Sequence, residues 1–312
     1  MDYIGICIGL ILLIKGGDWL LDAAVALSIK LNIPKIVIGM TVVSFATSAP
    51  ELIVSIKSAI KGYPDLALGN VVGSNIANLA LVLGTVLVIS PIEVTKSFYK
   101  TDWPMMLFTS LLFYYFIKND GVLSQYEGGI FVVLLVLFLV YLLFFQKKAI
   151  IEDHLGSLNQ DLNQSKLLIL LAAGGFFLWL GSEVLIKSAV SLATAMGVSE
   201  RIISISIVSV GTSIPELSAS IIAILNKEKA ISIGNLIGSN VFNILAVMGV
   251  TALINPVKMM DQALLNNDFL WMLGVSFLIF PLVFINKSMR LGRLEGLVLL
   301  SLYGIFLYQM LG

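Results

Sequence analysis

The chain repeats itself at a fixed distance of 165 residues, and this feature limits its fold more than any other. Moving the sequence by that distance places TVVSFATSAPELIVSI, which starts at Thr41, on SIVSVGTSIPELSASI, which starts at Ser206. The same shift places LGNVVGSNIAN, from Leu68, on IGNLIGSNVFN, from Ile233, and neither match needs a gap. A long internal repeat implies two similar structural units, so the chain should fold as two related halves.

Long apolar segments fill both halves. Of the 312 residues, 58% are hydrophobic and 12% are charged, whereas about a quarter of the residues in a soluble domain carry a charge. The outside of the protein must therefore face a lipid bilayer, and we predict an all-α membrane protein with ten transmembrane helices. The expected helices cover residues 3–29, 36–60, 66–90, 103–117, 127–146, 167–196, 201–225, 231–254, 268–286 and 293–311.

The longest polar stretch divides the two halves. We expect residues 1–146 to form the first five-helix repeat, 147–166 a linker and 167–312 the second repeat. Because each half crosses the membrane an odd number of times, the second half enters from the opposite side, which gives an inverted repeat. Odd-numbered loops, including those with Lys30, Lys147 and Lys227, hold more Lys and Arg than even-numbered loops. This bias predicts a cytoplasmic linker and two outward-facing termini.

Composition also excludes several classes of function. The formal net charge is zero, so no basic field is available to attract nucleic acid. Cys7 is the single cysteine and His154 the single histidine, which argues against a disulfide, a zinc site or histidine-based catalysis. We expect no bound cofactor and no required protein partner.

Hydroxyl, amide and carboxylate side chains follow the repeated motifs at spacings of three and four residues, which places them on one face of each helix. The first set and its copy comprise Ser44, Thr47, Ser48, Glu51, Ser55, Ser209, Thr212, Ser213, Glu216 and Ser220. The second set and its copy comprise Asn70, Ser74, Asn78, Asn235, Ser239 and Asn243. Four helices should therefore carry oxygen-rich stripes.

Glu51 and Glu216 lie near the middle of apolar spans, where a charged side chain costs roughly 2.5–3.5 kcal/mol on insertion scales. Pro50 and Pro215 precede them, so we expect the helices to break at Ala49 and Ile214 and to expose backbone carbonyls. Carboxylate, hydroxyl, amide and carbonyl oxygens suit hard cations such as Ca2+ and Na+. Two carboxylates neutralise one Ca2+ or two Na+, which predicts exchange of one load for the other.

These motifs resemble those of the sodium/calcium exchangers of the cation/Ca2+ exchanger superfamily, in ATSAPE, GNVVGSN, GTSIPE and GNLIGSN. The resemblance implies a ten-helix antiporter of the prokaryotic inner membrane that works by alternating access, with sliding of the first and sixth helices. It implies that Glu51 and Glu216 bind Ca2+ with the backbone oxygens of Thr47 and Thr212. For Na+ it implies those glutamates, Ser48, Ser74, Ser213, Ser239 and the backbone oxygens of Ser44 and Ser209.

The sequence departs from the family pattern at two positions. Asn243 stands where some relatives, notably the potassium-dependent exchangers, have Asp, which argues against K+ cotransport. Ala46 stands where the second repeat has Gly211, which predicts a local difference between the two helix breaks.

Other interpretations are also open at this point. An H+/Ca2+ antiporter of the same superfamily would use the same glutamates, although proton binding needs no hydroxyl cage. An intramembrane hydrolase could activate water with two carboxylates, but nothing else in the sequence supplies a nucleophile or a metal triad. A passive channel is a further alternative, but inverted repeats with broken helices argue against it. Asp18, Asp22, Glu183 and Lys187 are expected near helix ends, where they can pair or reach the interface.

Overall fold

The computed structural model describes residues 2–145, 163–197, 211–285 and 289–311. Each of the ten expected apolar segments is mostly helical where it is described, and most of the predicted linker and the start of the seventh segment lie outside these residues. By length and composition, six described helices could cross a membrane, or seven if one broken pair counts as a single span. The prediction of a mainly helical membrane protein is therefore confirmed.

Helices of the first half correspond to the first five expected segments. The label η marks a π-helical segment. The described helices are α1 (Asp2–Leu31), α2 (Lys35–Ile38), η1 (Gly39–Val43), α3 (Ser44–Thr47), α4 (Ala49–Ile60), α5 (Pro64–Ile76), η2 (Ala77–Val82), α6 (Leu83–Ile89), η3 (Phe98–Asp102), α7 (Trp103–Asp120) and α8 (Gln125–Phe145). Those described in the second half are α9 (Gln164–Ala195), α12 (Ile214–Leu225), α13 (Lys229–Phe242), η5 (Asn243–Met248), α14 (Gly249–Ile254), η6 (Leu264–Asp268), α15 (Phe269–Ile285) and α16 (Arg293–Leu311).

The helices group into two compact units that do not coincide with the two repeats. Unit 1 contains residues 1–47 and 138–236, and unit 2 contains residues 48–137 and 237–310. Each unit therefore takes segments from both halves of the sequence. Two of the boundaries fall inside the repeated motifs, directly after Thr47 and after Leu236, and a third falls after Leu137.

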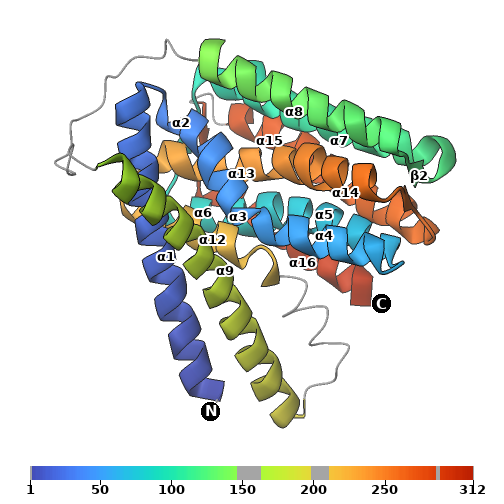
Figure 1. The fold of residues 1–312 in the computed structure, drawn as a ribbon, viewed down its shortest axis with the longest axis horizontal. Helices are drawn as coiled ribbons and strands as arrows, with labels where there is room; N and C mark the ends of the chain where they lie inside the picture. The colour runs from blue at the N-terminus through green and yellow to red at the C-terminus, as the bar shows by residue number, and fades with distance from the viewer. Residues whose placement is uncertain (1, 146–162, 198–210, 286–288, 312) are drawn as a thin grey trace. The chain divides into compact units, whose positions relative to one another are not determined.

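In unit 1, α1 and α9 lie side by side and run in opposite directions (Figure 1). Glycines line the contact, because a Cβ on Gly16 would come within 2.9 Å of the Gly174 carbonyl oxygen. A Cβ on Gly9 would likewise come within 3.0 Å of the Gly181 carbonyl oxygen. Gly9 corresponds to Gly174, and Gly16 to Gly181, under the repeat shift. The two backbones can approach this closely only because all four residues lack side chains.

The predicted helix breaks are present, but they fall one residue earlier than expected. Ser48 has φ −87° and ψ 3°, and Ser213 has φ −89° and ψ 4°, whereas Ala49 and Ile214 are the first residues of α4 and α12. A proline ring clashes with the carbonyl of the fourth residue before it, so a proline is tolerated in the first turn and the chain must leave the helix upstream. The angles at Ser48 and Ser213 are nearly identical, although Thr47 before the first break is helical and its copy Thr212 lies in a turn.

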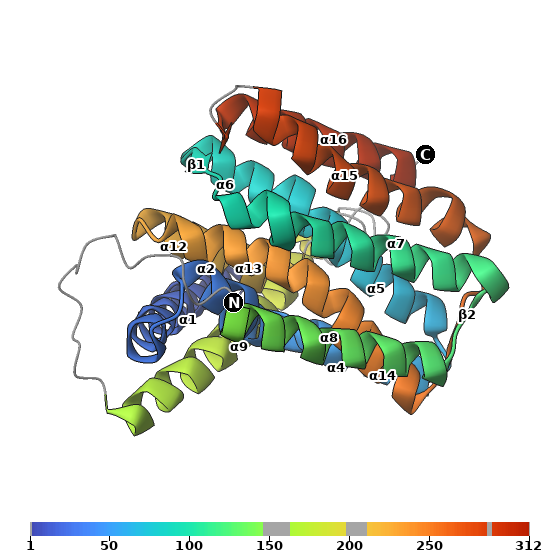
Figure 2. The same ribbon diagram turned by 90° about the horizontal axis from the view of Figure 1, so that it is seen from above.

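In unit 2, glycine contacts again join equivalent helices. Gly84 of α6 meets Gly296 of α16, and Gly249 of α14, its copy under the repeat shift, meets Gly128 of α8. Two short ribbons connect the helix ends: β1 (Ile92–Glu93) pairs antiparallel with β4 (Arg290–Leu291), and β2 (Val122–Leu123) pairs antiparallel with β3 (Val257–Lys258). Figure 2 shows α7 beside α15 in this unit, and the Trp271 indole of α15 donates a hydrogen bond to Gln309 of α16.

The charged residues of α1 and α9 do not all lie where we expected them. Asp18 sits close to the middle of the 30-residue helix α1 rather than near an end. Glu183 and Lys187 do form the expected pair, with 3.2 Å between Oε2 and Nζ across one turn of α9. Asp18 was already central in the predicted segment 3–29, so the expectation of a position near a helix end was wrong.

Candidate functional site

Unit 1 holds one set of the predicted site residues around the amide of Asn235. Thr47 Oγ1 donates a hydrogen bond of 3.2 Å to Asn235 Oδ1, and Asn235 Nδ2 donates one of 3.1 Å to Ser220 Oγ. Ser44 Oγ lies 2.9 Å from the Asn235 carbonyl oxygen and 2.8 Å from that of Gly39. These contacts join α3, α12 and α13 at the level of the helix break and keep the polar groups satisfied.

Glu216 is the third residue of α12, directly after the break at Ser213, and its side chain is fully buried. Ser213 is also buried, and its hydroxyl makes no hydrogen bond to any residue that the structure describes. Thr212 lies in the turn before α12 and is half-buried. Ser209 lies outside the described residues.

Unit 2 holds the matching set from the first half. Glu51 is the third residue of α4, directly after the break at Ser48, and both side chains are buried. Asn70 Nδ2 donates hydrogen bonds of 3.3 Å to the Glu51 carbonyl oxygen and 3.0 Å to Ser55 Oγ. The Asn70–Ser55 contact is the copy of the Asn235–Ser220 contact in unit 1. The repeat seen in the sequence is thus a repeat of hydrogen bonds as well.

Each glutamate lies in the first turn of its helix. The first turn of a helix presents unpaired N–H groups and the positive end of the helix dipole, which together stabilise a nearby anion. Pro50 and Pro215 occupy the second helical positions, where their missing N–H costs no helical hydrogen bond. The sequence therefore breaks each helix in a way that leaves a buried carboxylate at the start of a new one.

The remaining predicted residues lie on α5, η2, α13 and η5 in unit 2. The side chains of Ser74, Ser239, Asn78 and Asn243 are all at most 2% exposed. Asn78 and Asn243 contact two asparagines that the motif analysis did not single out, Asn75 and Asn240. The sequence could have identified Asn75 and Asn240, because both are polar residues at equivalent positions of two apolar spans.

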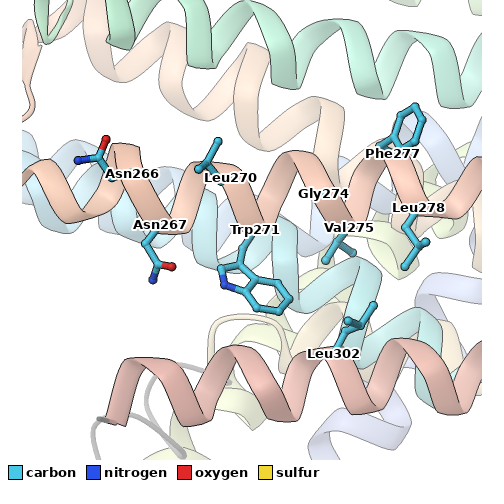
Figure 3. Close-up of a pocket in the computed structure, with 9 residues that line it drawn as sticks. All are labelled: Asn266, Asn267, Leu270, Trp271, Gly274, Val275, Phe277, Leu278 and Leu302. Atoms are coloured by element: carbon cyan, nitrogen blue, oxygen red, sulfur yellow. The ribbon is translucent and has the colours of Figure 1, made fainter.

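A groove of about 370 Å³ in unit 2 contains none of the predicted site residues. It runs between α15 and α16, and Figure 3 shows Trp271 pointing into the space between the two helices, above Leu302. The lining residues are Asn266, Asn267, Leu270, Trp271, Gly274, Val275, Phe277, Leu278 and Leu302. The site residues are instead packed among helices, as expected for groups that bind small ions rather than an organic ligand.

These features define a class of membrane protein: an inverted-repeat exchanger with one broken, glutamate-bearing helix in each repeat. The family model described as "Sodium/calcium exchanger protein" matches residues 1–144 and 166–312. The chain belongs to this family, which confirms the resemblance of its motifs.

Known proteins support the assignment over nearly the whole chain. The chain is 36% identical over 304 residues to the inner membrane protein YrbG of Escherichia coli (strain K12), with 94% of this chain and 91% of YrbG covered. It is 29% identical over 350 residues to the sodium/calcium exchanger MaX1 of Methanosarcina acetivorans, covering 98% and 97% of the two chains. A solved structure of the sodium-calcium exchanger NCX_Mj, soaked with zero Na+ and Ca2+, superposes with a TM-score of 0.82 at 28% identity, covering 97% of each chain. The chain therefore has the ten-helix fold, with two inverted five-helix repeats, that its sequence predicts.

Proposed function

We propose that the protein is a secondary active antiporter that exchanges Na+ for Ca2+ across the membrane by alternating access. One observation carries the proposal. Glu51 and Glu216 are completely buried, occupy equivalent positions of the two repeats and each start a helix directly after the same backbone break. Paired carboxylates of this kind inside a member of the exchanger family are best explained as a shared cation site.

The chemistry around the glutamates supports hard cations. Ca2+ takes about six to eight oxygen ligands, and carboxylate, carbonyl, hydroxyl and amide oxygens all serve. In our proposal Ca2+ binds the two glutamates and the backbone oxygens of Thr47 and Thr212. The full proposed ligand set for Ca2+ and Na+ is Glu51, Glu216, Thr47, Thr212, Ser44, Ser209, Ser48, Ser213, Ser74, Ser239, Asn78 and Asn243.

Charge balance explains why such a site exchanges ions instead of leaking them. One Ca2+ or two Na+ neutralise two carboxylates, so either load removes the cost of holding them in low-dielectric surroundings. The empty dianion retains that cost, and the unloaded site is disfavoured from changing sides. Transport in one direction is thereby coupled to transport in the other.

The distribution of Lys and Arg supports an orientation for the chain. We propose that both termini face outward, that residues 147–166 form a cytoplasmic linker and that the protein resides in a prokaryotic inner membrane. Because Cys7 is the single cysteine, a Cys7→Ser background allows single-cysteine labelling with an impermeant maleimide. A single cysteine introduced near the N-terminus should then react when the impermeant maleimide is outside the cell. Reaction only from the cytoplasmic side would contradict this orientation.

The test is uptake of radioactive Ca2+ into liposomes that contain the purified protein. We expect uptake when Na+ is higher inside than outside, and background uptake with a proton gradient alone. Glu51→Gln and Glu216→Gln should each reduce Na+-driven uptake to background, because each removes one of the two balancing charges. Glu295→Gln is the matched control, since Glu295 is another buried carboxylate, at the start of α16 and outside the motifs.

Two results would count against the proposal. Uptake driven by protons and not by Na+ would identify an H+/Ca2+ antiporter. Flux that needs no gradient, or that survives both glutamate substitutions, would rule out paired-glutamate exchange.

A further inference from the structure

Four buried asparagines, two from each repeat, meet within unit 2. Asn75 and Asn78 come from α5 and η2, Asn240 and Asn243 come from α13 and η5, and each is at most 1% exposed. Asn75 corresponds to Asn240, and Asn78 to Asn243, under the repeat shift. All four belong to the same compact unit, so their contacts are defined within it.

The four amides contact one another in two equivalent pairs. Asn243 Nδ2 donates a hydrogen bond of 3.1 Å to Asn75 Oδ1, and Asn78 Nδ2 donates one of 3.4 Å to Asn240 Oδ1. In each pair an outer asparagine, Asn78 or Asn243, donates to an inner one from the other repeat. Asn75 Nδ2 also donates to the Asn240 backbone carbonyl at 3.3 Å, which ties the inner residues together.

Two methionines fix which way the inner amides point. Asn240 Nδ2 lies 3.6 Å from Met106 Sδ, and Asn75 Nδ2 lies 3.9 Å from Met272 Sδ. A thioether sulfur accepts hydrogen bonds and donates none, so each inner NH2 group faces its methionine and each inner carbonyl faces the outer asparagine. The outer amides must then present their NH2 groups inward and their oxygens away from the pair.

The side-chain oxygens of the two outer asparagines, Asn78 Oδ1 and Asn243 Oδ1, are therefore available to a ligand. Among the residues that the structure describes, neither Asn78 Oδ1 nor Asn243 Oδ1 accepts a hydrogen bond, although both atoms are buried. Buried amide oxygens nearly always have a partner, so a matched pair without one indicates a ligand that the protein is built to receive. A neutral amide oxygen is a good ligand for a hard cation or for a water bound to one.

Resting on the proposed exchange function, we propose that Asn75 and Asn240 are positioning residues that set the cation affinity of the site. Each holds the amide of an outer asparagine from the opposite repeat so that its oxygen, and not its NH2 group, faces the ion. Loss of either inner carbonyl would free the outer amide to rotate and to present two donors to a cation. The expected defect therefore lies in ion affinity and not in the folded state.

Cation binding and transport are measured separately on the same preparations. Asn75→Leu and Asn240→Leu remove the inner carbonyl at nearly constant side-chain shape, and Ser110→Ala, a buried hydroxyl of α7 in the same unit, is the matched control. We expect each Leu variant to bind radioactive Ca2+, in a scintillation proximity assay, about fivefold more weakly, the size of one lost orienting hydrogen bond. Displacement by Na+ should shift by a similar factor, while the maximal uptake rate per folded protein stays within about twofold of wild type.

Combined substitutions separate positioning from general damage. Because Asn75 acts through Asn243, Asn75→Leu should add nothing to the effect of Asn243→Ala, whereas it should add fully to that of Asn78→Ala. Should the Leu variants not yield folded protein, Asn75→Ala and Asn240→Ala remove the acceptor with a smaller side chain and carry the same test.

The outcomes distinguish this inference from the function on which it rests. Normal affinity in the inner variants, or equal coupling to both outer asparagines, would overturn the positioning role while leaving Na+/Ca2+ exchange intact. A second outcome separates the two proposals. If the inner variants bind Ca2+ more weakly with the predicted coupling, but the wild-type protein shows no Na+-driven uptake, the positioning role is supported and the exchange proposal is overturned. A wild-type protein that binds neither ion would overturn both.

Discussion

The helix breaks at Ser48 in the first half and at Ser213 in the second have nearly the same backbone angles but different neighbours. In the second half, Ser182 of α9 donates a hydrogen bond of 3.0 Å to the Gly211 carbonyl oxygen, which Pro215 has left without its helical partner. The equivalent residue in the first half is Gly17 of α1, which has no hydroxyl to offer. The two breaks are thus copied at the motif and supported differently around it.

Contacts that occur in both halves can be compared with contacts that occur in one half. The glycine contacts between α1 and α9, the Asn–Ser contacts and the asparagine pairs all occur twice, whereas the serine that supports a break occurs once. These three sets of contacts, which hold α1 to α9 or orient polar side chains, are symmetric. The hydrogen bond from Ser182 to the Gly211 carbonyl has no copy at Gly17, so removing it should affect the second half alone.

Breaking a copied contact should harm both halves and have the largest effect. A Cβ on Gly174 would lie 2.7 Å from the Leu20 nitrogen, and one on its copy Gly9 would lie 2.9 Å from the Leu185 nitrogen. Both obstacles are backbone atoms that cannot move aside, so Gly174→Ala and Gly9→Ala should each destabilise the protein by about 1–3 kcal/mol. The midpoint of thermal unfolding in detergent measures this.

Gly304→Ala is the control for the glycine variants, because among the described residues nothing lies within 4 Å of where its Cβ would be. It should leave stability unchanged or raise it by up to about 1 kcal/mol, since alanine favours helix. Equal midpoints for all three variants would mean that the close approach of α1 and α9 does not stabilise the fold.

Removing the unmatched support should have a smaller effect that is confined to the second half. Ser182→Ala leaves the buried Gly211 carbonyl without its donor, which should cost about 1–3 kcal/mol, toward the lower end because a carbonyl is easier to leave unpaired than an N–H. Ser301→Ala, which removes an exposed hydroxyl bonded to its own helix, provides the baseline in the same unfolding measurement. If the two serine variants unfold together, the breaks are supported equally and the asymmetry carries no energetic weight.

The sequence predicted more of the site than of the packing around it, and particular residues show why. Glu51, Glu216 and the break before each follow from local rules: a carboxylate in an apolar span and a proline within the helix. The break itself lies at Ser48 and Ser213, one residue before the expected positions, because the proline ring acts on the preceding turn. Spacing along one helix identified the oxygen-rich stripes, but it could not show that Asn235 is shared between Thr47 and Ser220.

The π-helical turns gave no signal in advance. η2 begins at Ala77 and η5 begins at Asn243, so the helices widen where they carry Asn78 and Asn243. Such turns often mark functional positions in helices, and they arise from tertiary contacts that a helical repeat pattern does not record. The sequence pattern likewise could not identify the asparagine partners of Asn75 and Asn240, because these contacts join residues 162 to 168 positions apart.

A second unmatched contact, the ion pair between Lys35 and Glu228 in unit 1, should have the smallest effect. Its Nζ and Oε1 atoms are 2.7 Å apart, with side chains 32% and 15% exposed, while the equivalent positions of the other half hold Glu200 and Tyr63. Partly exposed pairs are screened by water and salt, so Lys35→Met should cost at most about 1 kcal/mol, and less as salt is raised. Unfolding midpoints for Lys35→Met, Glu228→Gln and the double variant, measured at two salt concentrations, give the coupling free energy between the two side chains. A coupling free energy between Lys35 and Glu228 well above about 1 kcal/mol, or one that salt does not weaken, would mean that the pair is shielded from water. A contact present in only one half would then contribute more to stability than we expect.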